Sequence, residues 1–408
     1  MFVPDEFIDI YSDQRLGIQM KFGIFMSPYH IPGKSPSVSL GHDLDIIEHM
    51  DRLGFDEVWV GEHHSGGFEI VSAPDLLIAA AAERTKSICF GTGVTSVPYH
   101  HPLVTAGRIT LLDNLTRGRF TFGAGPGALV TDAHMMGIEP GNQRRMMEEG
   151  LSAITRLLRG ETVDMETDWF SLRDARLQLL PYKGRELEIA VASVRSPSGV
   201  KLAGRYGFGL LSIAATDPNG GFGFVGETWR LMEERARESG RSVSRDSWRM
   251  MAPIHLAETK EQACEDLRHG MVEMSKFGAT GPFAGEGVDI EEVLASTSHE
   301  EMVDGLNASG MGVVGTPDMA VELIRRLEKQ SGGFGTLLLA GSDWAGHAAT
   351  KRSLELFAEY VIPEFQGTVA SLRSSWDRLY AGRKVFGAEF RAAQDKAIAE
   401  DDAERAAR

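Results

Sequence analysis

A short apolar run, a glycine-containing turn and an amphipathic stretch follow one another eight times along this chain. The runs hold few polar residues, as expected for strands buried on both faces, and the stretches place apolar residues at helical spacing. The apolar runs predict strands at 20–26, 57–60, 88–93, 119–123, 188–192, 209–213, 249–256 and 335–340. The intervening and final stretches predict helices at 42–53, 73–84, 103–115, 141–158, 198–206, 225–239, 317–329 and 350–361.

This alternation is typical of α/β proteins built from parallel βαβ units, whose right-handed crossovers close most simply into a (β/α)8 TIM barrel. An open, doubly wound sheet is the alternative. We expect the barrel over 20–366, an N-terminal leader at 1–19 and a helical C-terminal extension at 367–408. Two insertions interrupt the repeat, a β-hairpin at about 161–180 and, after the seventh strand, a lid at about 258–314.

The composition argues against several classes of protein. The 58 acidic and 42 basic residues give a formal net charge of -16, which repels phosphate backbones and anionic membrane surfaces. The two cysteines, Cys89 and Cys264, lie outside any CxxC pattern and are compatible with a reducing cytosol. No apolar run approaches the ~20 residues that span a bilayer, and the first twenty residues do not resemble a signal peptide. We therefore expect a soluble, cytoplasmic protein with no nucleic-acid or membrane partner.

Functional groups gather where the predicted strands end. The segments that follow the first five strands are MSPYH (26–30), GEHHSGG (61–67), GTGVTSVPYHHP (91–102), GAGPGAL (123–129) and ASVRSPSG (192–199). In a TIM barrel the carboxyl ends of all strands meet at one mouth, and active sites are found there. The sequence therefore predicts one site at this mouth, rich in imidazole, aromatic, hydroxyl and glycine groups.

A metal site is one rival interpretation of the two histidine pairs, His63–His64 and His100–His101. Neither HxH nor HExxH occurs, and adjacent histidines on an extended chain point to opposite sides. We therefore predict no metal. The GAGPGA segment is only a weak dinucleotide-binding signal, because the acidic residue expected about 20 positions later is missing.

The segment around Arg195 and Ser196 precedes a predicted helix. Free backbone N–H groups, a hydroxyl and the positive end of the helix together form an anion site. A simple helix N-cap is the other interpretation of the same residues.

The strand ends, taken in order, resemble the bacterial-luciferase-like superfamily of flavin-dependent monooxygenases. The resemblance covers about 20–366 and rests on FGIFMSPYH, GEHHSGG, GTGVTSVPYHHP, LTRGRFTFGAGPGAL and NQRRMMEEG. The GEHHSGG and GPGAL forms look closest to the limonene-monooxygenase-like and diketocamphane-monooxygenase-like branch.

The resemblance implies a two-component enzyme. Such a barrel binds reduced FMN delivered by a separate flavin reductase, forms a flavin hydroperoxide with molecular oxygen, and oxygenates a small hydrophobic substrate such as a terpene, cyclic ketone or aldehyde. It also implies a homodimer. The alternatives are a deazaflavin-dependent hydride-transfer oxidoreductase of the same superfamily, a non-catalytic flavin-binding barrel and, outside the superfamily, a metal-dependent hydrolase.

The resemblance also assigns site residues by position. His63 matches the acid/base at the reacting edge of the flavin, and Glu62 either orients it or anchors the strand end. Gly93–Val94 matches a non-proline cis peptide bond beneath the flavin ring. The residues expected to hold the cofactor are Met26, Gly93, Val94, Gly125, Arg144, Ser193, Arg195 and Ser196. Those expected to line the substrate pocket are Tyr29, Phe68, Tyr99 and His100.

Two departures from the luciferase pattern affect the expected phosphate contacts. Pro126 stands where luciferase has a phosphate-binding arginine, and Arg195 stands where it has a glutamate. The positive charge could thus have moved from one loop to the other.

Overall fold

The computed structural model describes residues 19–193, 197–213, 224–280, 292, 294 and 296–407. The described chain separates after Val361 into two compact units. The first holds the predicted barrel and the second holds the C-terminal helices.

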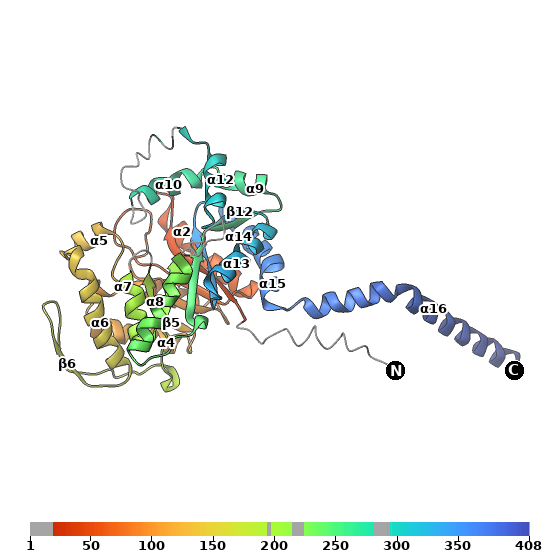
Figure 1. The fold of residues 1–408 in the computed structure, drawn as a ribbon, viewed down its shortest axis with the longest axis horizontal. Coiled ribbons are helices and arrows are strands. Elements are labelled where there is room, and N and C mark those ends of the chain that lie inside the picture. The colour runs from red at the N-terminus through yellow and green to blue at the C-terminus, as the bar shows by residue number, and fades with distance from the viewer. Residues whose placement is uncertain are drawn as a thin grey trace. The chain divides into compact units, whose positions relative to one another are not determined.

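Eight parallel strands of the first unit form a closed barrel (Figure 1). Around the ring they are β3 (Cys89–Thr92), β2 (Glu57–Val60), β1 (Lys21–Tyr29), β13 (Thr336–Ser342), β10 (Trp248–Ala252), β9 (Gly209–Ile213), β8 (Ile189–Ser193) and β5 (Phe120–Gly125). Pairing of β3 with β5 closes the ring, and the short strand β4 (Thr95–Ser96) pairs with the end of β5. The predicted (β/α)8 barrel is confirmed.

The helices that follow the strands begin and end where local chemistry dictates. They are α2 (Pro36–Leu53), α3 (Pro74–Ala82), α4 (Pro102–Leu115), α5 (Val130–Met135), α6 (Gln143–Leu158), α7 (Pro197–Tyr206), α8 (Phe224–Glu238), α13 (Pro317–Ser331) and α14 (His347–Leu356). Five of these begin at proline, whose missing N–H costs nothing in a first turn. Helix α2 ends at Gly54, which adopts a φ of 84°.

Two insertions leave the simple repeat. The hairpin of β6 (Val163–Glu166) and β7 (Ser171–Ala175) is antiparallel, as expected. The second insertion holds α9 (Lys260–Asp266), α10 (Gly270–Thr280) and α12 (His299–Ser309), which lie together in Figure 1. The prediction of one strand over 249–256 is wrong. Pro253 interrupts it, because proline cannot donate a ladder hydrogen bond, and β11 (Ile254–Leu256) pairs instead with β12 (Val313–Gly315).

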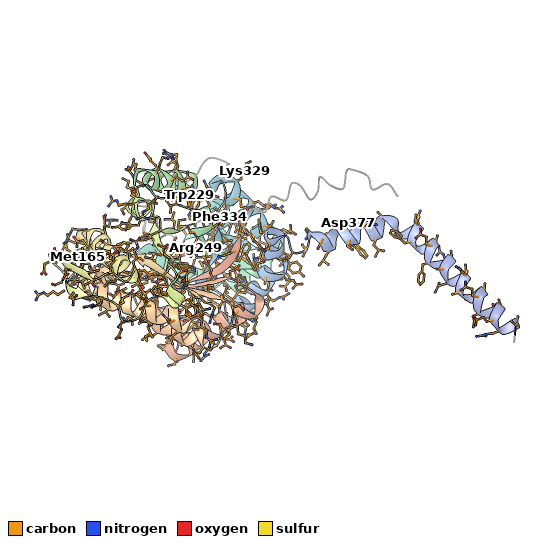
Figure 2. The ribbon with its side chains drawn as sticks, turned by 90° about the horizontal axis from the view of Figure 1, so that it is seen from below. Met165, Trp229, Arg249, Lys329, Phe334 and Asp377 are labelled. Carbon is orange, nitrogen blue, oxygen red and sulfur yellow. The ribbon has the colours of Figure 1, made fainter. Side chains whose placement is uncertain are left out.

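Charged side chains fill the amino-terminal half of the barrel interior. Arg249, labelled in Figure 2, donates to Glu57 at 2.8 and 3.1 Å and to Glu188 at 2.5 and 3.2 Å. The Arg249 guanidinium also lies 5.0 Å from the ring centre of Trp59, which donates its own N–H to Glu57. This layer closes one end of the barrel, so a ligand must enter from the carboxyl ends of the strands.

The second unit contains α15 (Ile362–Gln366) and α16 (Ala370–Ala406), so the C-terminal extension is helical as expected. None of the described helices is both long and apolar enough to cross a membrane.

Candidate active site

His63 lies just beyond β2, between two carboxylates. Its Nε2 atom is 2.7 Å from Glu69 Oε2, and its Nδ1 atom is 3.1 Å from Asp132 Oδ2. Asp132 lies in the first turn of α5. Glu69 lies on the loop after β2, and its backbone forms an isolated β-bridge with Tyr29 at the end of β1. Both carboxylates are buried. The loops after β2 and β5 therefore meet at this imidazole, and the end of β1 pairs with the first of them.

The two carboxylates set the charge of His63. Burial of the ring lowers its pKa, but the hydrogen bonds and negative charges of Glu69 and Asp132 outweigh burial, and the pKa of His63 is raised above its usual value. With an acceptor on each ring nitrogen, the imidazolium is the favoured form. The two carboxylates therefore favour a ring that carries a proton on each nitrogen.

Asp132 also fixes the loop that carries His63. Its second oxygen, Oδ1, accepts from the backbone N–H of His64 at 3.1 Å and from the hydroxyl of Ser65. Ser65 and Thr131 are hydrogen-bonded at 2.6 Å. The loops after β2 and β5 are thus tied together by one side chain, and the imidazole has little freedom to turn.

Glu62 anchors the strand ends and does not contact His63 through any hydrogen bond or ion pair found among the described residues. Its Oε1 lies 2.9 Å from His64 Nε2 and 2.7 Å from His100 Nε2, and its Oε2 accepts from Ser96 N–H at 2.8 Å. The carboxylate is fully buried. Of the two expected roles, orientation of His63 is wrong, whereas anchoring agrees with these contacts.

The same three side chains form a group that could hold a metal ion. The ligand atoms of Glu62, His64 and His100 all lie within 4.8 Å of one another. The argument from adjacent histidines did not foresee this group, because one histidine comes from each pair. The hydrogen bonds among these side chains already satisfy the atoms involved, so the cluster needs no ion to explain it.

The open end of the barrel has an apolar floor. Trp59 is buried at its centre with Ala190, Leu211 and Leu338. The side chains packed above this group are only partly buried, and they come from four different strand ends: Phe25, Val94, Ala192 and Met251. A flat aromatic ligand could lie against these four side chains with little desolvation of polar groups.

The peptide bond between Gly93 and Val94 is cis, as the resemblance led us to expect. Gly125, at the end of β5, lies directly against Val94: a Cβ atom at Gly125 would be 2.4 Å from Val94 Cγ2. Glycine is therefore required at 125 for the two loops to approach this closely.

Three aromatic rings gather beside the imidazole. Tyr29 stacks on Phe68 with ring centres 5.1 Å apart, and Phe277 of α10 lies 5.3 Å from Tyr29 and 5.0 Å from Phe68. The hydroxyl of Tyr29 is buried and has no hydrogen-bond partner within the described part of the chain. Burial and the charges of Glu273, Asp343 and Glu69 raise the pKa of Tyr29, so this hydroxyl keeps its proton.

The comparisons with known proteins agree with this geometry. Residues 20–333 match the family model described as luciferase-like monooxygenase. The chain belongs to the luciferase-like monooxygenase family. It is 44% identical over 392 residues to limonene 1,2-monooxygenase of Rhodococcus erythropolis, a match covering 96% of this chain and 98% of that one. It is 41% identical to 4-hydroxyprotoasukamycin monooxygenase of Streptomyces nodosus subsp. asukaensis, covering 88% and 95%.

A solved structure of the same family supports the fold. The oxygenating constituent of 3,6-diketocamphane monooxygenase from Pseudomonas putida, solved in complex with FMN, superimposes with a TM-score of 0.70. The two chains are 27% identical, over 85% of this chain and 99% of that one. The expected placement in the limonene- and diketocamphane-monooxygenase-like branch is thus confirmed.

Not every residue assigned by resemblance lies at the mouth of this luciferase-like barrel. Met26 faces outwards, where it lines a pocket with Ser39 and Ile46 of α2; the neighbouring residue Phe25 faces the interior instead. The predicted cofactor contact of Met26 does not fit this orientation, since Phe25 is the residue of this strand that faces the barrel interior. Arg144 lies in the first turn of α6 and is exposed.

The remaining assigned residues divide by location. Ser193 ends β8 at the mouth, whereas Arg195 and Ser196 lie outside the described residues. Tyr99 accepts a hydrogen bond from Gln143 at 3.0 Å, and burial raises its pKa to about 12. His100 is held by Glu62, as described above.

Sequence reasoning missed Glu69, Asp132 and Phe277. Glu69 and Asp132 have no motif of their own, and acidic residues on loops are usually solvated. One signal was available: Asp132 follows GAGPGAL by three residues and opens a helix, so it begins at the same mouth as the histidines.

Proposed function

We propose that this chain is the oxygenase of a two-component monooxygenase, which takes reduced FMN from a separate flavin reductase and uses molecular oxygen. His63, held between Glu69 and Asp132 at the same barrel mouth as the cis peptide bond, is the observation that carries the proposal. A mostly covered imidazole whose pKa is raised by two carboxylates, at the mouth of a barrel, is suited to proton transfer.

The residues at the mouth suit a flavin. Phe25, Val94, Ala192 and Met251 offer an apolar surface of four side chains, and Gly125 lets the loops close around it. The hydroxyl of Ser193 lies at the same end of the barrel. The phosphate is proposed to bind beyond it, at Arg195 and Ser196 before α7, where the free N–H groups of a helix start favour an anion.

Reduced FMN would supply the two electrons with which one atom of oxygen enters the substrate and the other leaves as water. The chain itself then has three tasks. His63 Nε2–H holds a proton against Glu69, and the pair can deliver it to the developing hydroxide. Tyr29, Phe68 and Phe277 exclude water from the reacting atoms. Asp132 keeps the imidazole oriented.

The substrate is proposed to be a small, cyclic, hydrophobic molecule, with a terpene ranked above a cyclic ketone or an aldehyde. The 44% identity to limonene 1,2-monooxygenase supports this order, because limonene is a hydrocarbon whose reactive groups are carbon–carbon double bonds. The aromatic rings of Tyr29, Phe68 and Phe277 suit such a molecule. Apolar pockets discriminate weakly by shape, so several related compounds should be accepted.

A rapid-mixing experiment tests the proposed function. The protein is loaded anaerobically with reduced FMN and mixed with oxygen, while flavin absorbance and incorporation of labelled oxygen into limonene, a camphor-type diketone and a long-chain aldehyde are followed. We expect a long-lived species distinct from reduced and oxidised FMN, and a labelled product. Immediate return to oxidised FMN with no product from any of the three compounds would contradict the proposal.

The variant His63→Ala isolates the imidazole. We expect FMN binding to persist and product formation to fall about 10²-fold or more, the usual contribution of a general acid–base group. The matched control is His134→Ala, because His134 is an exposed histidine on α5. An equal product yield in the two variants would remove His63 from the mechanism.

The same samples separate the rival interpretations. Structures of F420-dependent enzymes share the fold at 20% identity, which concerns the fold alone. Reduced deazaflavin that transfers hydride without oxygen would favour that class, and FMN binding without turnover would favour a non-catalytic barrel. Activity dependent on a bound metal would favour a hydrolase.

A further inference from the structure

Helix α16 (Ala370–Ala406) exposes a series of large apolar side chains. Leu372, Trp376, Leu379, Phe386 and Phe390 are between 41% and 68% exposed. No residue of this helix is buried. Large apolar groups at this density are uncommon on a free surface and mark a site of association.

The spacing of these side chains is that of a coiled-coil seam. Alternating steps of four and three residues connect Leu372, Trp376, Leu379, Arg383, Phe386, Phe390, Ala393 and Ala397. A repeat of this kind places one stripe along a helix, where it packs against another helix. The opposite side of α16 carries mainly small or charged residues such as Ala381, Ala388 and Asp395. The exposed apolar side chains outside the stripe are Tyr380, Val385 and Ile398, so the stripe holds most of the large apolar groups of the helix.

Charge is divided unequally between the two halves of α16. Residues 370–388 contain four basic residues and one acidic residue, a net charge of +3. Residues 389–407 contain six acidic and three basic residues, a net charge of −3. Two such helices repel each other when parallel and attract each other when antiparallel, so the helix is complementary to a reversed copy of itself.

Large and small side chains are also distributed unequally between the two halves of α16. The first half of the stripe carries Trp376 and Leu379, and the second half carries Ala393 and Ala397. An antiparallel pair places large side chains against small ones, whereas a parallel pair would place Trp376 against its own copy. Size and charge, which are independent features, therefore favour the same orientation.

Two glycines lie at the middle of the helix, beside the stripe. Glycine in a helix interior costs up to ~1 kcal/mol of helix stability relative to alanine. The presence of two glycines in this helix therefore requires an explanation. At Gly382 a Cβ atom would lie 2.3 Å from Phe386 Cε2, so the ring of Phe386 folds back over Gly382. Gly387 has open space around its Cα. Gly382 thus makes room for the ring of Phe386, and Gly387 leaves room for a second helix to approach at the midpoint.

We propose that α16 is a dimerisation helix, which pairs antiparallel with α16 of a second copy of this chain about a two-fold axis near residues 382–387. The interface is isologous, since the basic half of each helix lies along the acidic half of the other, and the assembly closes at two chains. The other possible occupants of the stripe are the barrel of the same chain, a different protein and a lipid surface. None of these requires the opposite charges of the two halves.

The first test measures association of the full chain by sedimentation over a range of concentrations. The variant Trp376→Glu/Phe390→Glu places two charges in the stripe, and Ala381→Glu/Ala388→Glu places the same two charges on the opposite side of α16. We expect the dimer dissociation constant to rise about tenfold or more in the first variant and by less than roughly twofold in the second. A monomeric wild-type chain, or equal effects of the two variants, would overturn the proposal.

The second test measures orientation. A ketone-bearing amino acid is encoded at 387 or at 402 and coupled to a nitroxide, which leaves the native cysteines untouched. In an antiparallel pair centred near 385, the two labels at 387 lie close together and the two labels at 402 lie about 50 Å apart, at 1.5 Å per residue. Short distances at both positions would indicate a parallel pair, and long distances at both would place the dimer contact elsewhere; either result overturns the proposal.

Discussion

His63 holds its proton because two buried carboxylates outweigh the burial of its ring. The pKa of His63 is raised in the folded chain, so its ion pairs stabilise the fold fully below the unfolded pKa, and this contribution is lost as the pH rises through the folded pKa. We expect Asp132→Asn to lower the pKa of His63, because one of the two charges that raise it is removed. Titration of the imidazole by NMR measures the shift.

The control for this experiment is Asp168→Asn, which removes an exposed carboxylate paired with Arg145 on the hairpin side of α6. Its effect on His63 should be negligible, because Asp168 is exposed to screening solvent and is not among the charges that shift the pKa of His63. If Asp132→Asn left the titration of His63 unchanged, Glu69 alone would set the charge of the imidazole. The conclusion that both carboxylates raise the pKa of His63 would then be wrong.

At the scale of elements, the polar layer inside the barrel is a stability feature placed opposite the functional mouth. Burial raises the pKa of Glu57, but Arg249 outweighs burial, and the pKa is lowered overall. The pair therefore stabilises the fold above the unfolded pKa of Glu57 and ceases to do so as the pH falls through the folded value. We expect Arg249→Met to cost about 3–5 kcal/mol of unfolding free energy, because Glu57 is left charged and buried. Urea denaturation measures this loss.

A double variant separates the ion pair from simple packing. Glu57→Gln/Arg249→Met leaves no buried charge behind, so it should lose less than Arg249→Met alone. The exposed pair provides the comparison, since Arg145→Met should change the unfolding free energy far less than Arg249→Met does. Additive effects of the two buried substitutions would show that Arg249 and Glu57 stabilise the barrel independently.

The elements also explain which parts of the fold were predictable. Strands buried on both faces appear as uninterrupted apolar runs, and the eight of them were found for that reason. Because such strands are apolar on both faces, the sequence does not show which side chains point into the barrel. No alternation of polar and apolar residues distinguishes Phe25 from Met26. The sequence indicates His63 because it belongs to a motif. It does not indicate Glu69 and Asp132, because these residues contact His63 only once separate loops meet in the fold. Pro253 is a visible signal in the sequence that the seventh strand ends.

At the scale of the whole molecule, the chain divides into a unit with a large core and a unit in which Ile362 is the one buried hydrophobic among the described residues. The separation falls at Val361, close to the proposed boundary between the barrel at 20–366 and the extension at 367–408. The core clusters around Trp59 and Trp344 lie before that point, and α16 contributes no buried side chain. The two units should therefore depend on each other little for their stability.

A chain that ends at Gln366 tests this independence. At concentrations where the full chain is monomeric, we expect the calorimetric melting temperature to stay within about 2 °C, because no buried apolar surface is removed. A chain that ends at Leu356 is the control: it also loses Phe357, which is fully buried against Phe22 and Phe55 and whose removal should cost several kcal/mol. If the chain ending at Gln366 melted as early as the control, α16 would be part of the folded barrel. It could not then be the free dimerisation helix that its charge, spacing and glycines indicate.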